Sequence, residues 1–459
     1  MKVRLQTNPM LVHFILPAVL VMGVPAVWAG NPTTTAPNPD LETLVQQYFK
    51  EKDASRRAEI GVAIQSHEGV DVERVVEALA RVKVWEPRPA GPADFAYASA
   101  AGVRKTVRMV VPEGYSPDRS YPLAIGLYEG PEAEAQTFME SFTADASPVL
   151  VALPRGFAGG CFAGSAAEAL EPEDLLREIR LRYHVDVDRV YVIGAGEKNG
   201  AAAINLALFH AHWIAGVIAL EPAPDAPYPR QAYPFLLQNL SNTPLFIARV
   251  SRPASQAQSR PADERVLPDP LEVIQAVALR EKLPISVTQI QDFRQAADGA
   301  WRNAIRELLH TRRQADARVV SHWFRYPVQG RVGWLRQETF DGEPWEDSLI
   351  TVLSAPSTDF HTYATKVLQS KLAYIGGRIE GRRITISAER TDRLELRLHQ
   401  GLLDLSQPIE IDWAGHTRTT VKVTPRISTV LETAYEDWDF QHPASVRLIA
   451  HRDGTLRQR

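Results

Sequence analysis

The chain has 459 residues, 45% of them hydrophobic, which is enough to bury more than one core. Its net charge of −4, with charges of both signs interspersed, argues against nucleic acid or an anionic membrane as a partner. Cys161 is the only cysteine, so intramolecular disulfides are excluded and stability has to come from packing.

Residues 1–29 have the features of a secretory signal peptide. Lys2 and Arg4 give the positive start, residues 11–24 the apolar centre, and residues 27–29 a small-residue cleavage site. The apolar run is shorter than the roughly 20 residues that span a bilayer. We therefore expect removal of this segment, no stable membrane insertion afterwards, and an exported protein in the periplasm or outside the cell.

Residues 30–39 have the composition of a linker, and residues 40–92 are predicted to form a small helical segment. Asp40 is placed to cap its first helix, whose apolar residues fall on one face. Further helices are predicted over 54–67 and 71–82. We expect this segment to serve packing rather than a separate function.

Strands and helices alternate over residues 93–317, a pattern typical of an α/β domain. Near-continuous apolar runs of strand length predict a mostly parallel sheet that is covered by helices on both faces. The predicted strands are 107–112, 121–127, 148–154, 190–193, 214–220, 244–250 and 285–290, and the predicted helices are 171–183, 200–210, 270–282 and 298–313.

Residues 318–459 have a different pattern, because their apolar residues alternate with period two. Runs such as 383–388 and 394–398 therefore predict a β-sandwich-like domain. One helix is predicted over 428–437, where Thr429 and Glu432 are spaced as a capping box.

Several segments of the α/β region carry a family resemblance. They include Val110-Val-Pro-Glu-Gly-Tyr-Ser-Pro117, Tyr183-His-Val-Asp-Val-Asp-Arg-Val-Tyr-Val-Ile-Gly194, and the helix and strand predicted to follow. Over about residues 104–314 this order resembles the secreted esterase branch of the α/β-hydrolases, the feruloyl-esterase and polyhydroxybutyrate-depolymerase type. The resemblance implies an α/β-hydrolase fold and a carboxylester hydrolase with a Ser–His–acid triad.

The strand-to-helix corner that carries the nucleophile in the resembled family has no serine in this chain. The family motif there is G-x-S-x-G, with the serine on a strained turn. Counting forward from Gly194 puts the serine position at Gly196, and counting back from Gly200 puts it at Lys198. We therefore predict a degenerate corner without a catalytic residue. The degenerate positions are Gly194, Gly196, Glu197, Lys198 and Gly200.

The acid of the implied triad has only poor candidates in this sequence, and its histidine has none at the expected position. The family acid would follow the strand that ends at Val250, where Asp263 and Glu264 are available but have the setting of solvated loop residues. The family histidine would lie in the loop 291–301, which contains none. His310 comes near the end of the next helix, a position typical of a surface residue that favours the helix dipole.

The implied oxyanion loop is altered as well. Where the resembled enzymes often have His-Gly-Gly, this chain has Tyr128, Glu129 and Gly130. A carboxylate aimed at a developing oxyanion would raise the barrier, because that position needs hydrogen-bond donors. If the cleft binds a ligand, its candidate residues are these three with Gly196 and Lys198.

The sequence gives little support for another nucleophile, a metal site or a cofactor site. Cys161 could act as a nucleophile, but the sequence shows no cation and base beside it to form a thiolate. Glu197 and Lys198 could act as carboxylate and amine nucleophiles, but both have the setting of solvated turn residues. His210 and His212 form the one cluster that resembles a ligand set, without the further ligands at metal-site spacing. No dinucleotide or phosphate motif is present, so we predict no metal and no cofactor.

Three functions remain open from the sequence. The leading hypothesis is an exported, catalytically impaired or inactive esterase homologue that binds a small ester, glycan or peptide, or acts in assembly. The alternatives are an active carboxylester or peptide hydrolase with an atypical site, and a structural envelope protein.

Overall fold

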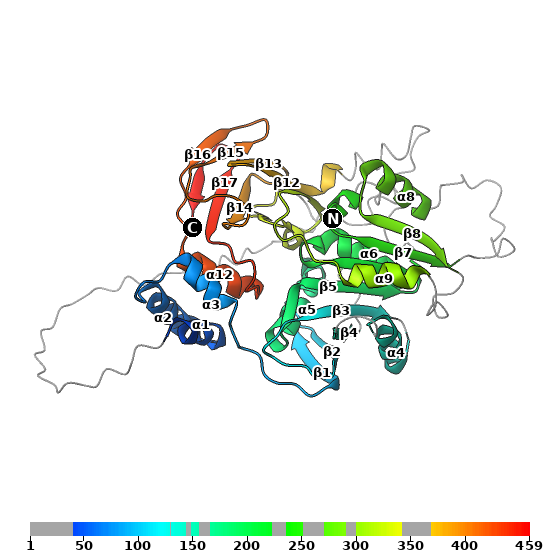
Figure 1. Ribbon diagram of the computed structural model, residues 1–459. Helices are drawn as coiled ribbons and strands as arrows, with labels where there is room; N and C mark the ends of the chain where they lie inside the picture. The colour runs from blue at the N-terminus through cyan, green and yellow to red at the C-terminus, as the bar shows by residue number, and fades with distance from the viewer. Residues whose placement is uncertain are drawn as a thin grey trace, which may run out of the picture. The chain divides into compact units, whose positions relative to one another are not determined.

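The computed structural model describes residues 40–128, 130–143, 148–155, 166–222, 236–250, 270–290, 300–341 and 369–459 (Figure 1). These residues belong to one compact unit. The signal peptide and linker predicted before residue 40 lie outside the described residues, and so do Glu129, Cys161, Asp263 and Glu264.

An eight-stranded, mostly parallel sheet forms the centre of the α/β domain, in the order β1-β2-β4-β3-β5-β6-β7-β8. Strand β2 runs antiparallel to both of its neighbours, and the pairs from β4 through β3 to β8 are parallel. The expected mostly parallel sheet is thereby confirmed. Its strands are β1 (Gly91–Ala98), β2 (Arg104–Val111), β3 (Tyr121–Tyr128), β4 (Leu150–Pro154), β5 (Val185–Ala195), β6 (Gly216–Leu220), β7 (Leu245–Val250) and β8 (Ile285–Ile290).

Helices cover both faces of this sheet. Alternate residues of β5 point to opposite faces, so Val190 and Val192 pack in one core and Tyr191 and Ile193 in the other. The first core is completed by α5 (Ala166–Arg182), α6 (Glu197–His210) and α8 (Pro270–Glu281), and the second by α4 (Glu132–Thr143) and α9 (Ala300–Leu309). The predicted helix at 200–210 begins three residues earlier, because the chain turns at the single residue Gly196.

The second domain is a β-sandwich, as expected. Two five-stranded sheets have the orders β10-β11-β14-β17-β18 and β16-β15-β13-β12-β9. Ile384 and Ile386 of one sheet share a buried core with Leu394 and Leu396 of the other. The strands are β9 (Val319–Phe324), β10 (Arg331–Val332), β11 (Leu335–Gln337), β12 (Ala373–Glu380), β13 (Arg383–Glu389), β14 (Arg393–Leu398), β15 (Ile409–Trp413), β16 (Arg418–Val421), β17 (Val446–His451) and β18 (Leu456–Gln458).

The one helix of this domain that was predicted is α12 (Ile427–Asp437). The predicted capping box is wrong, because Arg426 occupies the cap position and no side chain caps the helix there. Thr429 lies inside the first turn and is buried, so its hydroxyl is not at the helix start.

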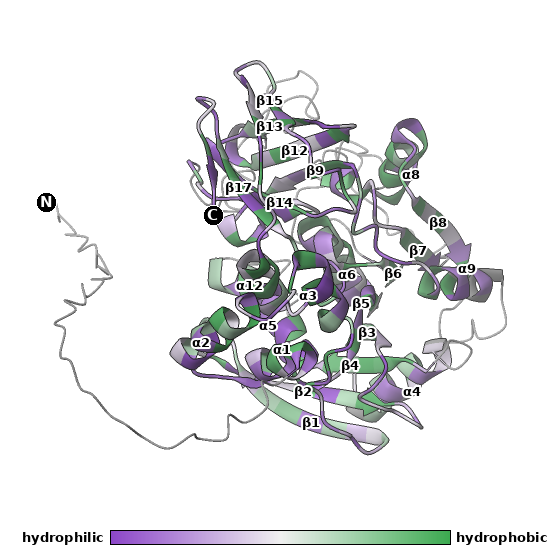
Figure 2. Ribbon diagram, turned by 60° about the vertical axis from the view of Figure 1, so that its left-hand side comes forward, coloured by the Kyte–Doolittle hydropathy of each residue, from purple (hydrophilic) through white to green (hydrophobic). Residues whose placement is uncertain are grey.

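The N-terminal helices pack on α12, more than 340 residues away in sequence, since α12 starts at Ile427 and α3 ends at Leu79 (Figures 1 and 2). Val75 of α3 shares a buried core with Val430. Asp40 caps the first helix as predicted, and its Oδ1 accepts a hydrogen bond of 2.7 Å from Thr43 N. The helices are α1 (Leu41–Lys50), α2 (Ala54–Gln65) and α3 (Val72–Leu79), and β1 begins two residues before the predicted domain boundary.

Trp85 joins this helical group to both domains. Its ring stacks on His184 at 3.8 Å between centroids and 10° between planes, and meets Phe440 edge-on at 5.6 Å. Its Nε1 donates a hydrogen bond of 2.7 Å to the carbonyl of Arg180 in α5. One side chain in the connection from α3 to β1 therefore contacts the α/β domain at Arg180 and His184 and the second domain at Phe440.

We expect Trp85→Ala to lower the free energy of unfolding by about 2–3 kcal/mol, somewhat less than for a fully buried tryptophan, because the ring is partly exposed. Trp85→Phe keeps the ring contacts and loses the hydrogen bond, so it should cost about 1 kcal/mol. Urea denaturation of both variants measures this. Equal losses in the two variants would contradict a role for the stacked ring.

Candidate functional site

Gly196 occupies the corner between β5 and α6. The strand ends at Ala195, Gly196 has φ 91° and ψ 168°, and α6 begins at Glu197. Gly196 N donates to the carbonyl of Leu220 on the neighbouring strand at 3.0 Å. Of the two positions at which the family serine could fall, Gly196 is therefore the turn residue, and Lys198 lies in the first turn of α6.

The glycines around this corner are required for different physical reasons. A Cβ at Gly194 would lie 2.1 Å from the carbonyl oxygen of Asn199, and one at Gly200 would lie 2.7 Å from that of Leu220. These two residues are glycine because α6 packs closely against the strands. A Cβ at Gly196 would meet nothing within 4 Å, so only its positive φ favours glycine there. The corner faces open space and carries no side chain.

The structure brings the other described candidates of the cleft to the same edge of the sheet. Tyr128 at the end of β3 is in register with Ala195 at the end of β5, and the two strands are parallel. Gly130 follows with φ 146°, while Lys198 is exposed at the start of α6. Tyr128, Gly130, Gly196 and Lys198 therefore all lie near the carboxyl ends of β3 and β5.

His310 lies toward the opposite edge of the sheet. It directly follows α9, whose last carbonyl, that of Leu309, accepts a hydrogen bond of 2.6 Å from the Tyr191 hydroxyl. Tyr191 precedes Gly196 by five residues of extended strand, or roughly 16 Å. His310 is exposed, and this separation places it far from any reaction at Gly196.

The histidine pair at the end of α6, His210 and His212, contacts one carboxylate. Glu173 Oε1 accepts hydrogen bonds from His210 Nδ1 and Trp213 Nε1, both at 2.9 Å, and lies 3.3 Å from His212 Nε2. Burial lowers the pKa of His212 to about 4, so its imidazole is neutral at physiological pH. Within the described residues, no group of three or more His, Cys, Asp and Glu is arranged to hold a metal. The pair anchors the end of α6 to α5.

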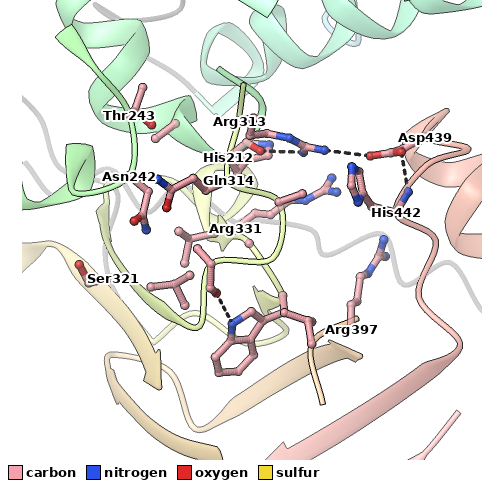
Figure 3. A pocket seen from close by; sticks show the side chains of 18 of the residues that line it. His212, Asn242, Thr243, Arg313, Gln314, Ser321, Arg331, Arg397, Asp439 and His442 are labelled. Atoms are coloured by element: carbon pink, nitrogen blue, oxygen red, sulfur yellow. Dashed lines mark hydrogen bonds and ion pairs between the residues drawn. The ribbon is translucent and has the colours of Figure 1, made fainter. Parts of the chain in front are cut away.

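A polar cluster lies between the two domains, and Figure 3 shows three of its four members, Arg313, Asp439 and His442. No local pattern in the sequence predicts it. His442, after α12, donates from Nε2 to Asp188 Oδ2 of β5 at 2.9 Å. Arg313, after α9, donates from Nη2 to Asp188 Oδ1 at 3.0 Å and to Asp439 Oδ2 at 3.1 Å. We call these four residues the junction cluster, because two come from each domain.

Electrostatics within the junction cluster favour its charged forms. Burial raises the pKa of Asp188, but the hydrogen bond from His442 and the charge of Arg313 hold it well below its usual value. Burial lowers the pKa of His442, but the hydrogen bond to Asp188 and the charge of Asp439 raise it above its usual value. The imidazolium form of His442 is therefore stabilised by the folded structure.

Asp437, the last residue of α12, is surrounded by three guanidinium groups. Arg331 Nη1 and Arg397 Nη1 each donate to it at 2.8 Å, and Arg336 Nη2 donates at 3.2 Å. Burial raises the pKa of Asp437, but the three arginines hold it far below its usual value. This carboxylate links β10, β11 and β14 to the end of the helix.

Comparison with known proteins gives distant structural matches only. No family model and no curated protein matches the chain. A thermostable esterase aligns over 48% of this chain and 63% of its own, with 16% identity and a TM-score of 0.35. A ferulic acid esterase of Anaeromyces mucronatus aligns over 50% of this chain and 94% of its own, with 13% identity and a TM-score of 0.33.

An S-formylglutathione hydrolase of Staphylococcus aureus aligns over 49% of this chain and 97% of its own, with 15% identity and a TM-score of 0.34. TM-scores of this size do not indicate a shared activity. The α/β-hydrolase-like character of the fold rests on the strand order and the corner at Gly196. In the described part of the chain, no helix has the length and apolar character needed to cross a membrane.

Proposed function

We propose that this chain is an exported protein of α/β-hydrolase-like fold that lacks esterase activity and acts in binding or assembly. Gly196 carries the proposal, because it occupies the strand-to-helix corner and supplies no oxygen to attack an ester. In a triad enzyme, loss of the nucleophile alone lowers turnover about a million-fold. The loop 291–301, where the resembled family has its base, contains no histidine in the sequence.

Export is proposed on the composition of residues 1–29 alone. The test is N-terminal sequencing of the protein recovered from the periplasm or medium of an expressing cell. A mature chain that starts near residue 30 supports export. An intact leader on protein found only in the cytoplasm would contradict it.

We expect purified mature protein to leave p-nitrophenyl and feruloyl esters unhydrolysed, at the rate of a heat-inactivated control, and to remain unlabelled by a fluorophosphonate probe. Gly196→Ser should stay within about tenfold of that background, because a Cβ at this position meets no described atom within 4 Å, so the added hydroxyl has room but no adjacent base. Gly196→Ala, which brings the same backbone strain without the hydroxyl, is the matched control.

Turnover by the wild-type chain well above the heat-inactivated control would overturn the proposal in favour of an active hydrolase. Glu197 and Cys161 would then be the residues to replace first, since each could supply a nucleophile.

A further inference from the structure

A small cavity lies between α5 of the α/β domain and the end of α12 in the second domain. Residues of η1 (Ala211–Trp213), of β10 and of the segment after α9 complete its wall. Four of the wall residues are labelled in Figure 3, namely His212, Arg313, Arg331 and Asp439. Arg180 of α5 lies in the wall and precedes β5, whereas Gly196 follows that strand, which has 11 residues or roughly 35 Å of extended chain. The cavity is therefore remote from the corner.

The side chain of Arg180 is buried in this wall and only partly bonded. The residue is 8% exposed, and its Nη1 donates to the carbonyl of Asp437 at 3.2 Å. Its Nε and Nη2 are buried and have no hydrogen-bond partner among the described residues. These two nitrogens form one edge of the planar guanidinium group, and such an edge donates two parallel hydrogen bonds to an oxyanion. The unmet donors of Arg180 therefore have the geometry that an oxyanion requires.

The charge of Arg180 is incompletely compensated. Burial lowers its pKa to about 10, although carboxylates at longer range act in the opposite direction. The group therefore stays a cation at neutral pH. Arg177, one turn earlier on α5, is exposed and also lines the cavity. In the part of the chain that the structure describes, neither arginine has a carboxylate within ion-pair distance.

Four carboxylates also line the cavity, but each already has donors of its own. They are Glu173, Glu436, Asp437 and Asp439. Histidine and indole N–H groups satisfy the first, and arginine side chains satisfy the other three. Arg313 and Arg331, the other arginines of the wall, are paired with carboxylates. The two guanidinium groups without a counter-ion are those of Arg177 and Arg180, and two positive charges match a dianion.

The size of the cavity limits the ligand. Its volume is about 110 Å³. A water molecule takes up about 30 Å³ in the liquid, so this space holds roughly three or four waters, or one compact anion in their place. A tetrahedral oxyanion is of this size, whereas a larger phosphate ester is not.

We propose that this cavity binds a free inorganic oxyanion, phosphate or sulfate, between the two domains. Arg180 donates to two of its oxygens through the edge formed by Nε and Nη2, and Arg177 adds a second positive charge from the solvent side. Chloride has a single atom and cannot receive two parallel bonds from that edge. Binding here is separate from the corner at Gly196, so ester hydrolysis and anion binding are tested independently.

The test is calorimetric titration of the full-length mature protein with inorganic phosphate and with sulfate, in a chloride buffer of constant ionic strength. Arg180→Lys keeps the charge but loses the two-donor edge, and Arg177→Gln removes the charge at an exposed position. Arg56→Gln, at an exposed position of α2, is the matched control. Circular dichroism without added oxyanion verifies that every variant is folded.

We expect one site per chain, and phosphate should also raise the unfolding temperature of the wild-type protein. The affinity should fall about tenfold in Arg180→Lys and about threefold in Arg177→Gln, where solvent screens the charge, and stay unchanged in Arg56→Gln. Glycerol 3-phosphate should bind about tenfold more weakly than phosphate, because its substituent exceeds the cavity.

Three results would overturn the inference. The first is no saturable binding of either oxyanion, which would mean that water alone occupies the cavity. The second is an affinity that both variants leave unchanged. The third is competition by chloride at the same concentration as phosphate, or equal binding of glycerol 3-phosphate, since either would exclude a site shaped for a free oxyanion.

Discussion

Asp437→Asn is expected to lower the free energy of unfolding by about 3–5 kcal/mol, the range for breaking a buried ion pair from one side. The amide has the size of the carboxylate but no charge, so Arg331, Arg336 and Arg397 lose their shared counter-ion. Arg397 is the most buried of the three, with 8% of its side chain exposed. The position at the end of α12 makes the charge otherwise unfavourable, since a helix C-terminus repels an anion.

Urea denaturation at neutral pH measures this loss. Asp341→Asn changes an exposed carboxylate and should stay within about 0.5 kcal/mol of the wild-type chain. A loss below about 1 kcal/mol in Asp437→Asn would contradict the argument. It would mean that Glu395 and Glu436, which also contact Arg397, suffice to balance the arginines.

Most regular parts of the fold were predictable because they depend on local patterns, although no strand was predicted at β1 and no helix at α4. Apolar runs of strand length marked the central sheet, and period-two alternation marked the sandwich. Predicted boundaries failed where a single residue decides the geometry. The helix after the corner begins at Glu197 rather than at about residue 200, because Gly196 alone turns the chain and the polar residues 197–199 had the composition of a loop.

The candidate site at Gly196 could be examined from the sequence because the corner between β5 and α6 is one continuous segment. The junction cluster could not, because Asp188, Arg313, Asp439 and His442 meet only after two domains have packed. The available signal was the concentration of polar residues over 437–442, directly after a predicted helix. Nothing local in that run indicates that its partner is the start of a strand about 250 residues earlier.

The coupling between Asp188 and His442 is expected to depend on pH. The folded pKa of Asp188 is lowered, so its contribution is full above its unfolded pKa of about 3.9 and is lost as the pH falls through the folded value. The folded pKa of His442 is raised, so its contribution is full below its unfolded pKa of about 6.5 and is lost as the pH rises through the folded value. The pair should stabilise most between these limits.

A double-mutant cycle of Asp188→Asn and His442→Gln isolates this coupling from the contacts of Asp188 with Arg313, since those contacts are present in both arms. We expect a coupling energy of about 1–2 kcal/mol at pH 5.5, where His442 is an imidazolium. At pH 9 the imidazolium has lost its proton, so the coupling energy should fall below about 0.5 kcal/mol. His416→Gln, an exposed histidine in the turn after β15, replaces His442→Gln in the control cycle. A coupling energy equal at the two pH values would show that a neutral hydrogen bond, rather than an ion pair, joins the domains at this point.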